Sequence, residues 1–295
     1  MNCLKCLLPI EQGDVHYGLH MACFVAWFKA PATSEFLSLT RKHSTETTPE
    51  NTSFFHGRFK KYSAELNGVS YILKMREDEA PELPEVEYLC NQIGRLLEIP
   101  VAEFFIIKLE DDKIFVTKNF IPKLGSPIDL QHIKNFRVEA EHTCEDLIRI
   151  IADKTKRPYD VGVFIQTLLF DALIGNHDRH GRNIGFVVTS GGMVLSPVYD
   201  NTSYLGLEKG SMLKCDFNPT GKICTKETLE PSMVHYVREL KRLEYHDYSM
   251  EFYNKIKILQ LSKLIQDSFC SDLMKEAMTN LILKRYKELE SELKA

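Results

Sequence analysis

A polar loop followed by a hairpin constrains this chain more than any other part of its sequence. The loop, Gly175–Asn183, reads GNHDRHGRN and follows an apolar pattern of helical period, which Gly175-Asn176 is predicted to end. Strand-like runs at Ile184–Val188 and Met193–Leu195 then flank a Ser-Gly-Gly turn, and Asp200 follows the second run. Because a hairpin returns the chain to its starting point, we expect the loop and Asp200 to lie at the same end of one small sheet.

Three side chains of this region form an oxygen-rich set. Asp178 and Asn183 precede the hairpin, and Asp200 follows it. Magnesium prefers such oxygen ligands, and phosphoryl transfer needs a metal between the phosphates and a carboxylate that orients the attacking hydroxyl. We predict that Asp178 is the catalytic base and that Asn183 and Asp200 bind magnesium. His180 is predicted to orient the loop Gly175–Asn183, which we call the catalytic loop, rather than to transfer protons. The alternative is a polar loop whose side chains only cap turns.

A lysine at the end of a predicted strand completes the site on the nucleotide side. Lys74 lies near the end of the strand-like run Val69–Met75, where alternation places it on the same face as Ile72. There it can reach nucleotide phosphates and be held by a carboxylate of the following helix. We predict Glu87 as this partner, with Glu85 as the second choice. The alternative is a solvated lysine at a strand end.

One glycine lies where a phosphate-binding loop would precede the first hairpin. Backbone N–H groups next to Gly57, within His56–Lys61, are able to approach a phosphate. Arg58, Lys60 and Lys61 add positive charge, although such residues are more often a solvated edge.

The pattern of apolar residues divides the chain into two parts. Residues 1–121 contain a short opening segment at 1–30, a polar linker or surface loop at 31–52, and a strand-rich region with one helix at 53–121. Residues 122–295 carry mainly helical patterns, interrupted by the hairpin described above. We therefore expect an α+β fold with a small β-rich lobe and a larger helical lobe.

Within the strand-rich region, the expected order is hairpin, helix, hairpin. An Asn-Gly pair at 67–68 predicts the first turn, because both positions of such a turn need positive φ. Pro84, followed by carboxylates, predicts the start of the helix. Glu110-Asp111-Asp112 is the predicted second turn. The paired runs are Tyr62–Leu66 with Val69–Met75, and Val101–Leu109 with Lys113–Phe120.

The opening segment has the residue types of a structural zinc site. Cys3-x2-Cys6 and His20-x2-Cys23 provide four ligands in two closely spaced pairs. The alternative is a packed knot of thiols against the aromatic pair that follows, Trp27-Phe28.

Charge and composition narrow the classes of function. A net charge of −4 over 295 residues argues against nucleic-acid binding by broad phosphate neutralisation. The chain has no apolar run of transmembrane length and no signal-peptide core at its beginning, so we expect a cytoplasmic protein that does not bind membranes. In that compartment its eight cysteines are expected to be reduced.

Taken together, these motifs resemble the HipA-like family of bacterial serine/threonine toxin kinases. The similarity is greatest to short members of the HipT type, which lack the extra N-terminal subdomain of full-length HipA. It covers nearly the whole chain, and the catalytic loop and the segment ending at Asp200 are its most specific parts. The matching segments are 3–28, Gly57–Ser63, Tyr71–Lys74, Leu83–Val101, Leu173–Asn183 and Pro197–Asp200.

The resemblance implies a two-lobed protein-kinase-like fold with ATP in the cleft. It implies phosphorylation of a protein serine or threonine, with aminoacyl-tRNA synthetases as the known target class, and neutralisation by antitoxin proteins of the HipB and HipS types. Members of the family can be autophosphorylated on a serine of the Gly-rich loop. Phe54, Phe55 and His56 occupy the positions before Gly57 here, so Ser53 is the nearest upstream serine and the predicted autophosphorylation site.

Three other functions stay open at this point. Lipid kinases carry the same Gly-Asn-x-Asp-Arg-His-x-x-Asn pattern, although no membrane-binding element is evident here. A non-catalytic pseudokinase would not need Lys74, Asp178, Asn183 and Asp200 together. A zinc-dependent nucleic-acid binder acting through residues 1–30 is disfavoured by the acidic balance of the chain.

Overall fold

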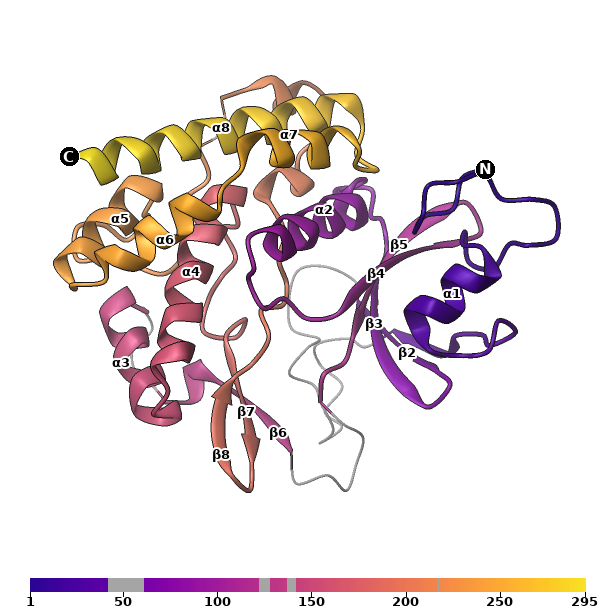
Figure 1. The fold of residues 1–295 in the computed structure, drawn as a ribbon, viewed down its shortest axis with the longest axis horizontal. Coiled ribbons are helices and arrows are strands. Elements are labelled where there is room, and N and C mark those ends of the chain that lie inside the picture. The colour runs from indigo at the N-terminus through magenta and orange to yellow at the C-terminus, as the bar shows by residue number, and fades with distance from the viewer. Residues whose placement is uncertain (42–60, 122–127, 137–141, 217) are drawn as a thin grey trace.

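The structure is a computed structural model that describes residues 1–41, 61–121, 128–136, 142–216 and 218–295 (Figure 1). The predicted phosphate-binding glycine, Gly57, and the predicted modification site, Ser53, lie outside these residues. The elements of the first half are α1 (Met21–Phe28), β1 (Leu37–Arg41), β2 (Lys61–Leu66), β3 (Val69–Lys74), α2 (Leu83–Leu96), β4 (Phe104–Leu109) and β5 (Asp112–Lys118).

The remaining elements are mainly helical. The strands are β6 (Asp129–His132), β7 (Gly185–Thr189) and β8 (Gly192–Leu195). The α-helices are α3 (Cys144–Thr155), α4 (Pro158–Ile174), α5 (Met233–Arg242), α6 (His246–Lys255), α7 (Ile258–Gln266) and α8 (Asp272–Lys294). Within the described ranges, the short 3-10 helices are η2 (Ile133–Phe136), η3 (Tyr204–Leu207) and η4 (Gly210–Lys214).

A five-stranded antiparallel sheet with the order β1-β2-β3-β5-β4 forms the first half. Its β2–β3 turn is the predicted one, because Asn67 and Gly68 both have positive φ, at 47° and 81°. The β4–β5 turn is shorter than predicted, since β5 already begins at Asp112 and Glu110 takes a positive φ of 53°. Alternate residues along these strands therefore point to opposite faces of one sheet.

Each face of this sheet is covered by a different element. Phe105 and Ile107 on β4 pack with the residues of α1, whereas Phe104 and Ile106 pack with Tyr88 of α2. Figure 1 shows α1 and α2 on the two sides of the sheet. Because α2 begins one residue before Pro84 and buries its apolar stripe, the predicted helix start is confirmed.

Two strands were absent from the prediction. The segment predicted as a linker or surface loop contains β1, which pairs with β2 through Leu37↔Glu65 and Thr40↔Ser63. Similarly, β6 pairs antiparallel with β7, so the predicted hairpin after the polar loop is part of a three-stranded sheet of order β6-β7-β8. Both strands are short and contain several polar residues, and each is paired with a longer strand.

Helix α4 forms the centre of the helical half. Nearly all of its residues are buried, and α3, α5, α6 and α8 pack around it. The long helix α8 runs along one side of the molecule (Figure 1). Among the residues that the structure describes, no helix combines the length and the apolar character needed to cross a bilayer.

Candidate active site

The end of α4 delivers the polar loop. Gly175 caps the helix with a φ of 70°, as its sequence position predicted. A Cβ atom at this position would lie 2.6 Å from Pro219 Cγ and 2.7 Å from Leu281 Cδ2, so glycine also permits close packing. Asn176 then turns the chain: its Nδ2 donates to Asp171 Oδ1 at 2.9 Å, and its Oδ1 accepts from the backbone N–H of Asp178 at 3.0 Å. The loop is thereby anchored on the helix that precedes it.

Hydrogen bonds to its backbone groups fix the position of Asp178, whereas its carboxylate stays accessible. Asn183 Nδ2 donates to the Asp178 carbonyl at 2.9 Å, which leaves Asn183 Oδ1 as the side-chain atom suited to a metal. The Asp178 side chain is 53% exposed, and His180 Nε2 lies 3.7 Å from its Oδ1. His180 Nδ1 accepts the N–H of Arg182 at 3.2 Å, a contact that orients the loop.

A buried arginine, which was not among the predicted site residues, joins the loop to the segment of Asp200. Arg179 donates to both carboxylate oxygens of Asp171, at 2.8 and 3.0 Å. It also donates to the carbonyls of Asn183 and Tyr199, at 3.2 and 2.5 Å, and to Asn201 Oδ1 at 2.6 Å. Burial by itself would lower the pKa of Arg179, but the charge of Asp171 outweighs this effect and raises it. One guanidinium group thus fixes both parts of the predicted metal site.

Asp200 has an unusual backbone conformation. Its φ of 54° lies in the left-handed region, which is uncommon for residues other than glycine. The residues on both sides are held in place, because the Tyr199 carbonyl and the Asn201 side chain bind Arg179. Fixed neighbours of this kind are what keep a residue in a sparsely populated conformation, and such residues are concentrated at functional sites.

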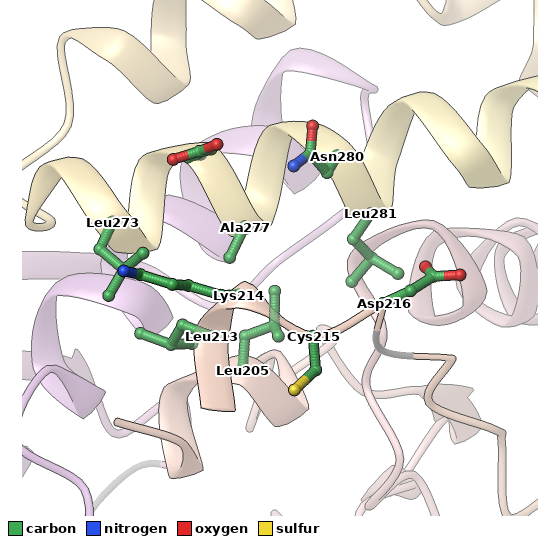
Figure 2. Close-up of a pocket in the computed structure, with 10 residues that line it drawn as sticks. Leu205, Leu213, Lys214, Cys215, Asp216, Leu273, Ala277, Asn280 and Leu281 are labelled. Carbon is green, nitrogen blue, oxygen red and sulfur yellow. The ribbon is translucent and has the colours of Figure 1, made fainter. Parts of the chain in front are cut away.

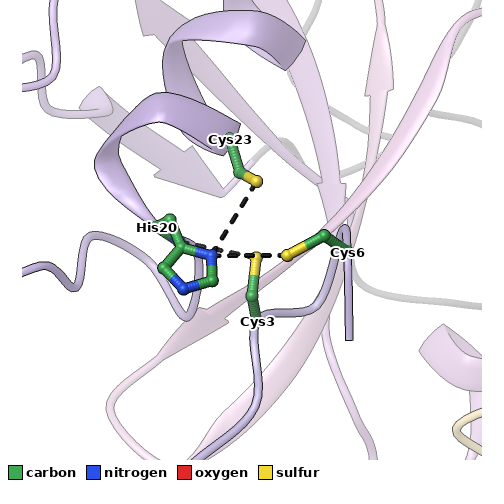
Figure 3. Close-up of side chains that lie close together, drawn as sticks. All are labelled: Cys3, Cys6, His20 and Cys23. Carbon is green, nitrogen blue, oxygen red and sulfur yellow. Dashed lines mark hydrogen bonds between the residues drawn. The ribbon is translucent and has the colours of Figure 1, made fainter. Parts of the chain in front are cut away.

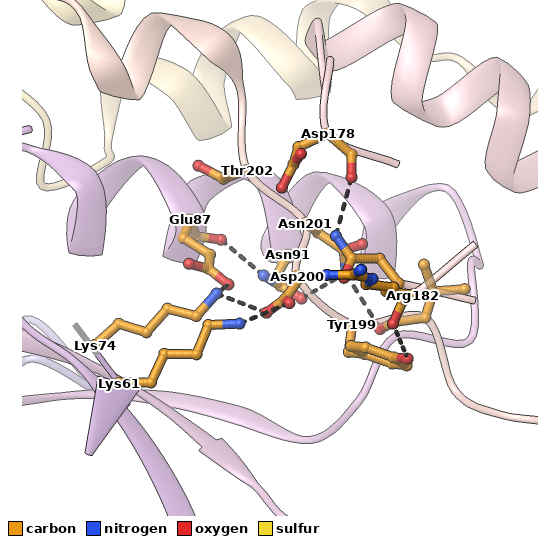
Figure 4. Close-up of polar contacts among 12 residues, drawn as sticks. Lys61, Lys74, Glu87, Asn91, Asp178, Arg182, Tyr199, Asp200, Asn201 and Thr202 are labelled. Atoms are coloured by element: carbon orange, nitrogen blue, oxygen red, sulfur yellow. Dashed lines mark hydrogen bonds and ion pairs between the residues drawn. The ribbon is translucent and has the colours of Figure 1, made fainter. Parts of the chain in front are cut away.

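Two lysines from the sheet converge on the Asp200 carboxylate (Figure 4). Lys74 Nζ lies 2.8 Å from Asp200 Oδ1 and 2.5 Å from Glu87 Oε1. Lys61 Nζ lies 2.8 Å from Asp200 Oδ2. The carboxylate of Glu85, the second choice for the partner of Lys74, instead pairs with Arg76. The structure therefore brings the sheet, α2 and the segment after β8 together at a single ion-pair cluster, formed by Lys61, Lys74, Glu87 and Asp200.

Within this cluster, the charged forms of Lys74 and Asp200 are stabilised by their neighbours. Burial alone would lower the pKa of Lys74, but the charges of Asp200 and Glu87 raise it above its usual value. Burial would raise the pKa of Asp200, whereas Lys61 and Lys74 together lower it below its usual range. Lys74 and Asp200 are therefore both charged at neutral pH.

Lys61 is not the solvated edge residue that its sequence context favoured. It is only 4% exposed, and its ammonium group contacts Asp200. Its neighbours in the basic run, Arg58 and Lys60, lie outside the described residues. In the register of β2 and β3, Lys61 lies directly opposite Lys74. Knowledge of this pairing would have identified Lys61 as a site residue, but the sequence alone does not give it.

Helix α2 is hydrogen-bonded to the segment around Asp200 through the side-chain amides of Asn91 and Asn201. Asn91 Nδ2 donates to the Glu87 carbonyl at 2.8 Å, and Asn201 Nδ2 donates to Asn91 Oδ1 at 3.0 Å. Asn201 in turn accepts from Arg179. The position of Glu87 is thus coupled through buried hydrogen bonds to the catalytic loop and to the backbone next to Asp200.

This arrangement has the chemistry of a site for a metal-bound polyphosphate. The oxygens of Asp200 and Asn183 are hard ligands of the type that magnesium prefers. Two buried lysine ammonium groups next to them are suited to anionic phosphates. The exposed carboxylate of Asp178 comes from the same loop as Asn183, where a substrate hydroxyl is able to reach it.

A separate cavity of about 590 Å³ lies between η4 and α8 (Figure 2). Leu213, Cys215 and Asp216 line one side of it, and Ala277 and Leu281 line the other. It contains none of the predicted catalytic or nucleotide-binding residues. The cavity is therefore distinct from the ion-pair cluster.

Comparison with known proteins gives the family and the fold. The family model described as the HipA-like C-terminal domain matches residues 40–279. The Helicobacter pylori proinflammatory kinase CtkA superposes with a TM-score of 0.66 at 17% identity, covering 79% of this chain and 93% of its own. HipA in the Shewanella oneidensis HipA, HipB and operator DNA complex superposes with a TM-score of 0.60 at 16% identity, covering 97% of this chain and 76% of its own. A search of curated proteins finds no match.

Proposed function

Since the chain belongs to the HipA-like C-terminal domain family, we propose that it is an ATP-dependent serine/threonine protein kinase. The fold is kinase-like, as in CtkA and HipA. The observation that carries the proposal is the position of Lys74, which binds both Glu87 and Asp200 at 2.5 and 2.8 Å. Protein kinases use such a lysine–glutamate pair to hold the nucleotide phosphates next to a metal-binding aspartate.

In this proposal, the ion-pair cluster binds the nucleotide. Lys74 and Lys61 contact phosphate oxygens, and Glu87 keeps Lys74 extended from β3 towards the cleft. Asp200 and Asn183 would hold magnesium, which would neutralise the negative charge of the phosphate oxygens. The domain boundary near residue 121 then separates a lobe that binds ATP from a lobe that carries the catalytic loop.

Asp178 acts on the protein substrate. Its exposed carboxylate accepts the proton of a serine or threonine hydroxyl while that oxygen attacks the terminal phosphorus of ATP. The phosphoryl group passes to the hydroxyl oxygen, and ADP is the leaving group. His180 and Asn183 hold the loop in the conformation that presents Asp178.

The target and the partners follow from the family resemblance. We propose that the protein is a cytoplasmic toxin, that an aminoacyl-tRNA synthetase is its substrate class, and that HipB- and HipS-like antitoxins bind it. The Shewanella HipA structure, which contains HipB and operator DNA, supports an antitoxin partner. Autophosphorylation at Ser53 is part of the same proposal, and phosphosite mapping of active protein that finds Ser53 unmodified would contradict it.

Transfer of label from ATP tests the reaction class. The purified chain is incubated with γ-labelled ATP, magnesium and a bacterial extract, and the products are separated into protein and lipid fractions. We expect phosphoserine or phosphothreonine in protein, and no transfer when EDTA removes magnesium. Label in the lipid fraction would support a lipid kinase instead, and no label in either fraction would support a pseudokinase.

Lys61 provides a second test, because the proposal gives it a direct phosphate contact. Replacing Lys61 by methionine is expected to weaken binding of magnesium–ATP about tenfold or more, since a hydrogen bond to a charged group contributes roughly 1.5–3 kcal/mol. Titration calorimetry measures the dissociation constant. Lys108→Met is the control, because Lys108 pairs with exposed Asp111 at the β4–β5 turn, away from the cluster. Equal affinities of the two variants would remove Lys61 from the site.

A further inference from the structure

Four side chains of the opening segment converge on one point, far from the ion-pair cluster in sequence. The ligand atoms of Cys3, Cys6, His20 and Cys23 all lie within 4.8 Å of one another. Figure 3 shows the three sulfur atoms arranged around the His20 ring. All three cysteines have free thiols in the structure.

The distances agree with tetrahedral coordination. His20 Nδ1 lies 3.3 Å from Cys6 Sγ and 3.9 Å from Cys23 Sγ. Tetrahedral zinc bonds of ordinary length place a nitrogen ligand and a sulfur ligand about 3.6 Å apart. The two observed distances lie on either side of this value, so small side-chain movements are sufficient to admit an ion.

Hydrogen bonds outside the cluster favour the required form of the imidazole. His20 Nε2 lies 3.0 Å from the Pro9 carbonyl, to which only a protonated Nε2 is able to donate. A neutral imidazole protonated at Nε2 presents the lone pair of Nδ1 to the thiols. Metal-binding histidines are typically oriented by such a second contact. The backbone N–H of His20 also lies 3.4 Å from Cys3 Sγ, a position that stabilises a thiolate.

The ligand set distinguishes a metal from a disulfide. A disulfide would join two of the sulfur atoms and leave the third thiol and the oriented imidazole without a role. Three thiolates and one imidazole, by contrast, are a complete ligand set for structural zinc. We propose that Cys3, Cys6, His20 and Cys23 bind one structural Zn²⁺ ion, with the three thiols releasing their protons to solvent on binding.

The ion would stabilise the packing of the opening segment and α1 on one face of the sheet. Cys3 and Cys6 lie in the turn at the start of the chain, whereas His20 and Cys23 lie at the start of α1. Further along α1, the ring of Phe28 lies 4.6 Å from that of Phe105 on β4 and 5.7 Å from that of Tyr71 on β3. Zinc would thus hold α1 against the sheet face opposite α2, and Tyr71 belongs to the strand that ends at Lys74.

Metal analysis of the untagged full-length chain tests this proposal directly. The chain is purified from zinc-supplemented cells and passed over a chelating resin that removes loosely bound ions. Cys6→Ser removes one ligand, and Cys215→Ser is the matched control, because both cysteines are exposed and neither forms a disulfide in the structure. We expect about one zinc ion per chain in the wild type and in Cys215→Ser, and about tenfold less in Cys6→Ser.

Cobalt substitution of the wild type keeps the test valid if the Cys6→Ser variant does not fold. Tetrahedral cobalt with thiolate ligands gives intense visible bands and a near-ultraviolet charge-transfer band, and one equivalent of zinc should abolish both. The proposal would be overturned if the purified wild type contained no zinc and its cobalt-treated form lacked these bands. It would also be overturned if the purified wild type contained iron in place of zinc. Equal zinc contents in the two cysteine variants would overturn the ligand assignment. None of these readouts depends on kinase activity, so this proposal and the proposed function fail or stand separately.

Discussion

Replacement of Asp178 by asparagine is expected to lower the rate of phosphoryl transfer about 10²- to 10⁴-fold, the usual contribution of a general base. Asparagine has nearly the same shape but cannot accept the substrate proton. The contacts that hold the loop here use the backbone N–H and carbonyl of Asp178, and the substitution leaves both in place. Binding of magnesium–ATP should therefore stay close to the wild-type value.

Single-turnover transfer to protein at saturating ATP measures this effect. Asp111→Asn is the control, because it is the same substitution at a fully exposed aspartate in the β4–β5 turn, away from the site. The control should transfer at the wild-type rate. A rate for Asp178→Asn that equals that of Asp111→Asn would falsify the role of Asp178 as base.

Replacement of Arg179 by alanine is expected to lower the free energy of unfolding by about 3–5 kcal/mol, because it leaves Asp171 as an uncompensated buried charge. Arg179 and Asp171 are 2% and 4% exposed. The same change removes the hydrogen bonds to the carbonyls of Asn183 and Tyr199, so the two parts of the predicted metal site lose their common anchor. Activity should fall together with stability.

Urea denaturation followed by circular dichroism gives the free energy of unfolding for this comparison. Arg182→Ala is the matched control, because Arg182 lies three positions further along the same loop and is exposed. A surface substitution of this kind usually changes stability by no more than about 0.5 kcal/mol. If the two variants were equally stable, the buried network around Arg179 would not hold the loop as described.

Much of the fold followed from local sequence signals. The Asn-Gly turn, the proline at the start of α2 and the glycine after α4 each act through backbone geometry, and the structure confirms all three. The α+β class with a small sheet and a larger helical part is confirmed as well. These predictions succeeded because each depends on a few neighbouring residues.

Features that depend on distant residues were missed. Strands β1 and β6 pair with β2 and β7, and at five and four residues they are too short for alternation alone to identify them. Lys61 looked like a surface residue because its partner, Asp200, is far along the chain. Similarly, the sequence motif contains Arg179 but does not indicate its role, which depends on carbonyls that only the folded chain brings together.

In the proposed mechanism, Asp200 binds magnesium–ATP and Asp178 accepts the substrate proton, and one set of assays measures both properties. Magnesium-dependent ATP binding and phosphoryl transfer are determined for the wild type, Asp178→Asn and Asp200→Asn, each shown to be folded by circular dichroism. We predict that Asp178→Asn binds ATP like the wild type but transfers phosphate about 10²- to 10⁴-fold more slowly, and that Asp200→Asn loses both properties. Transfer at the wild-type rate by Asp178→Asn, or undiminished magnesium-dependent binding by Asp200→Asn, would contradict the account.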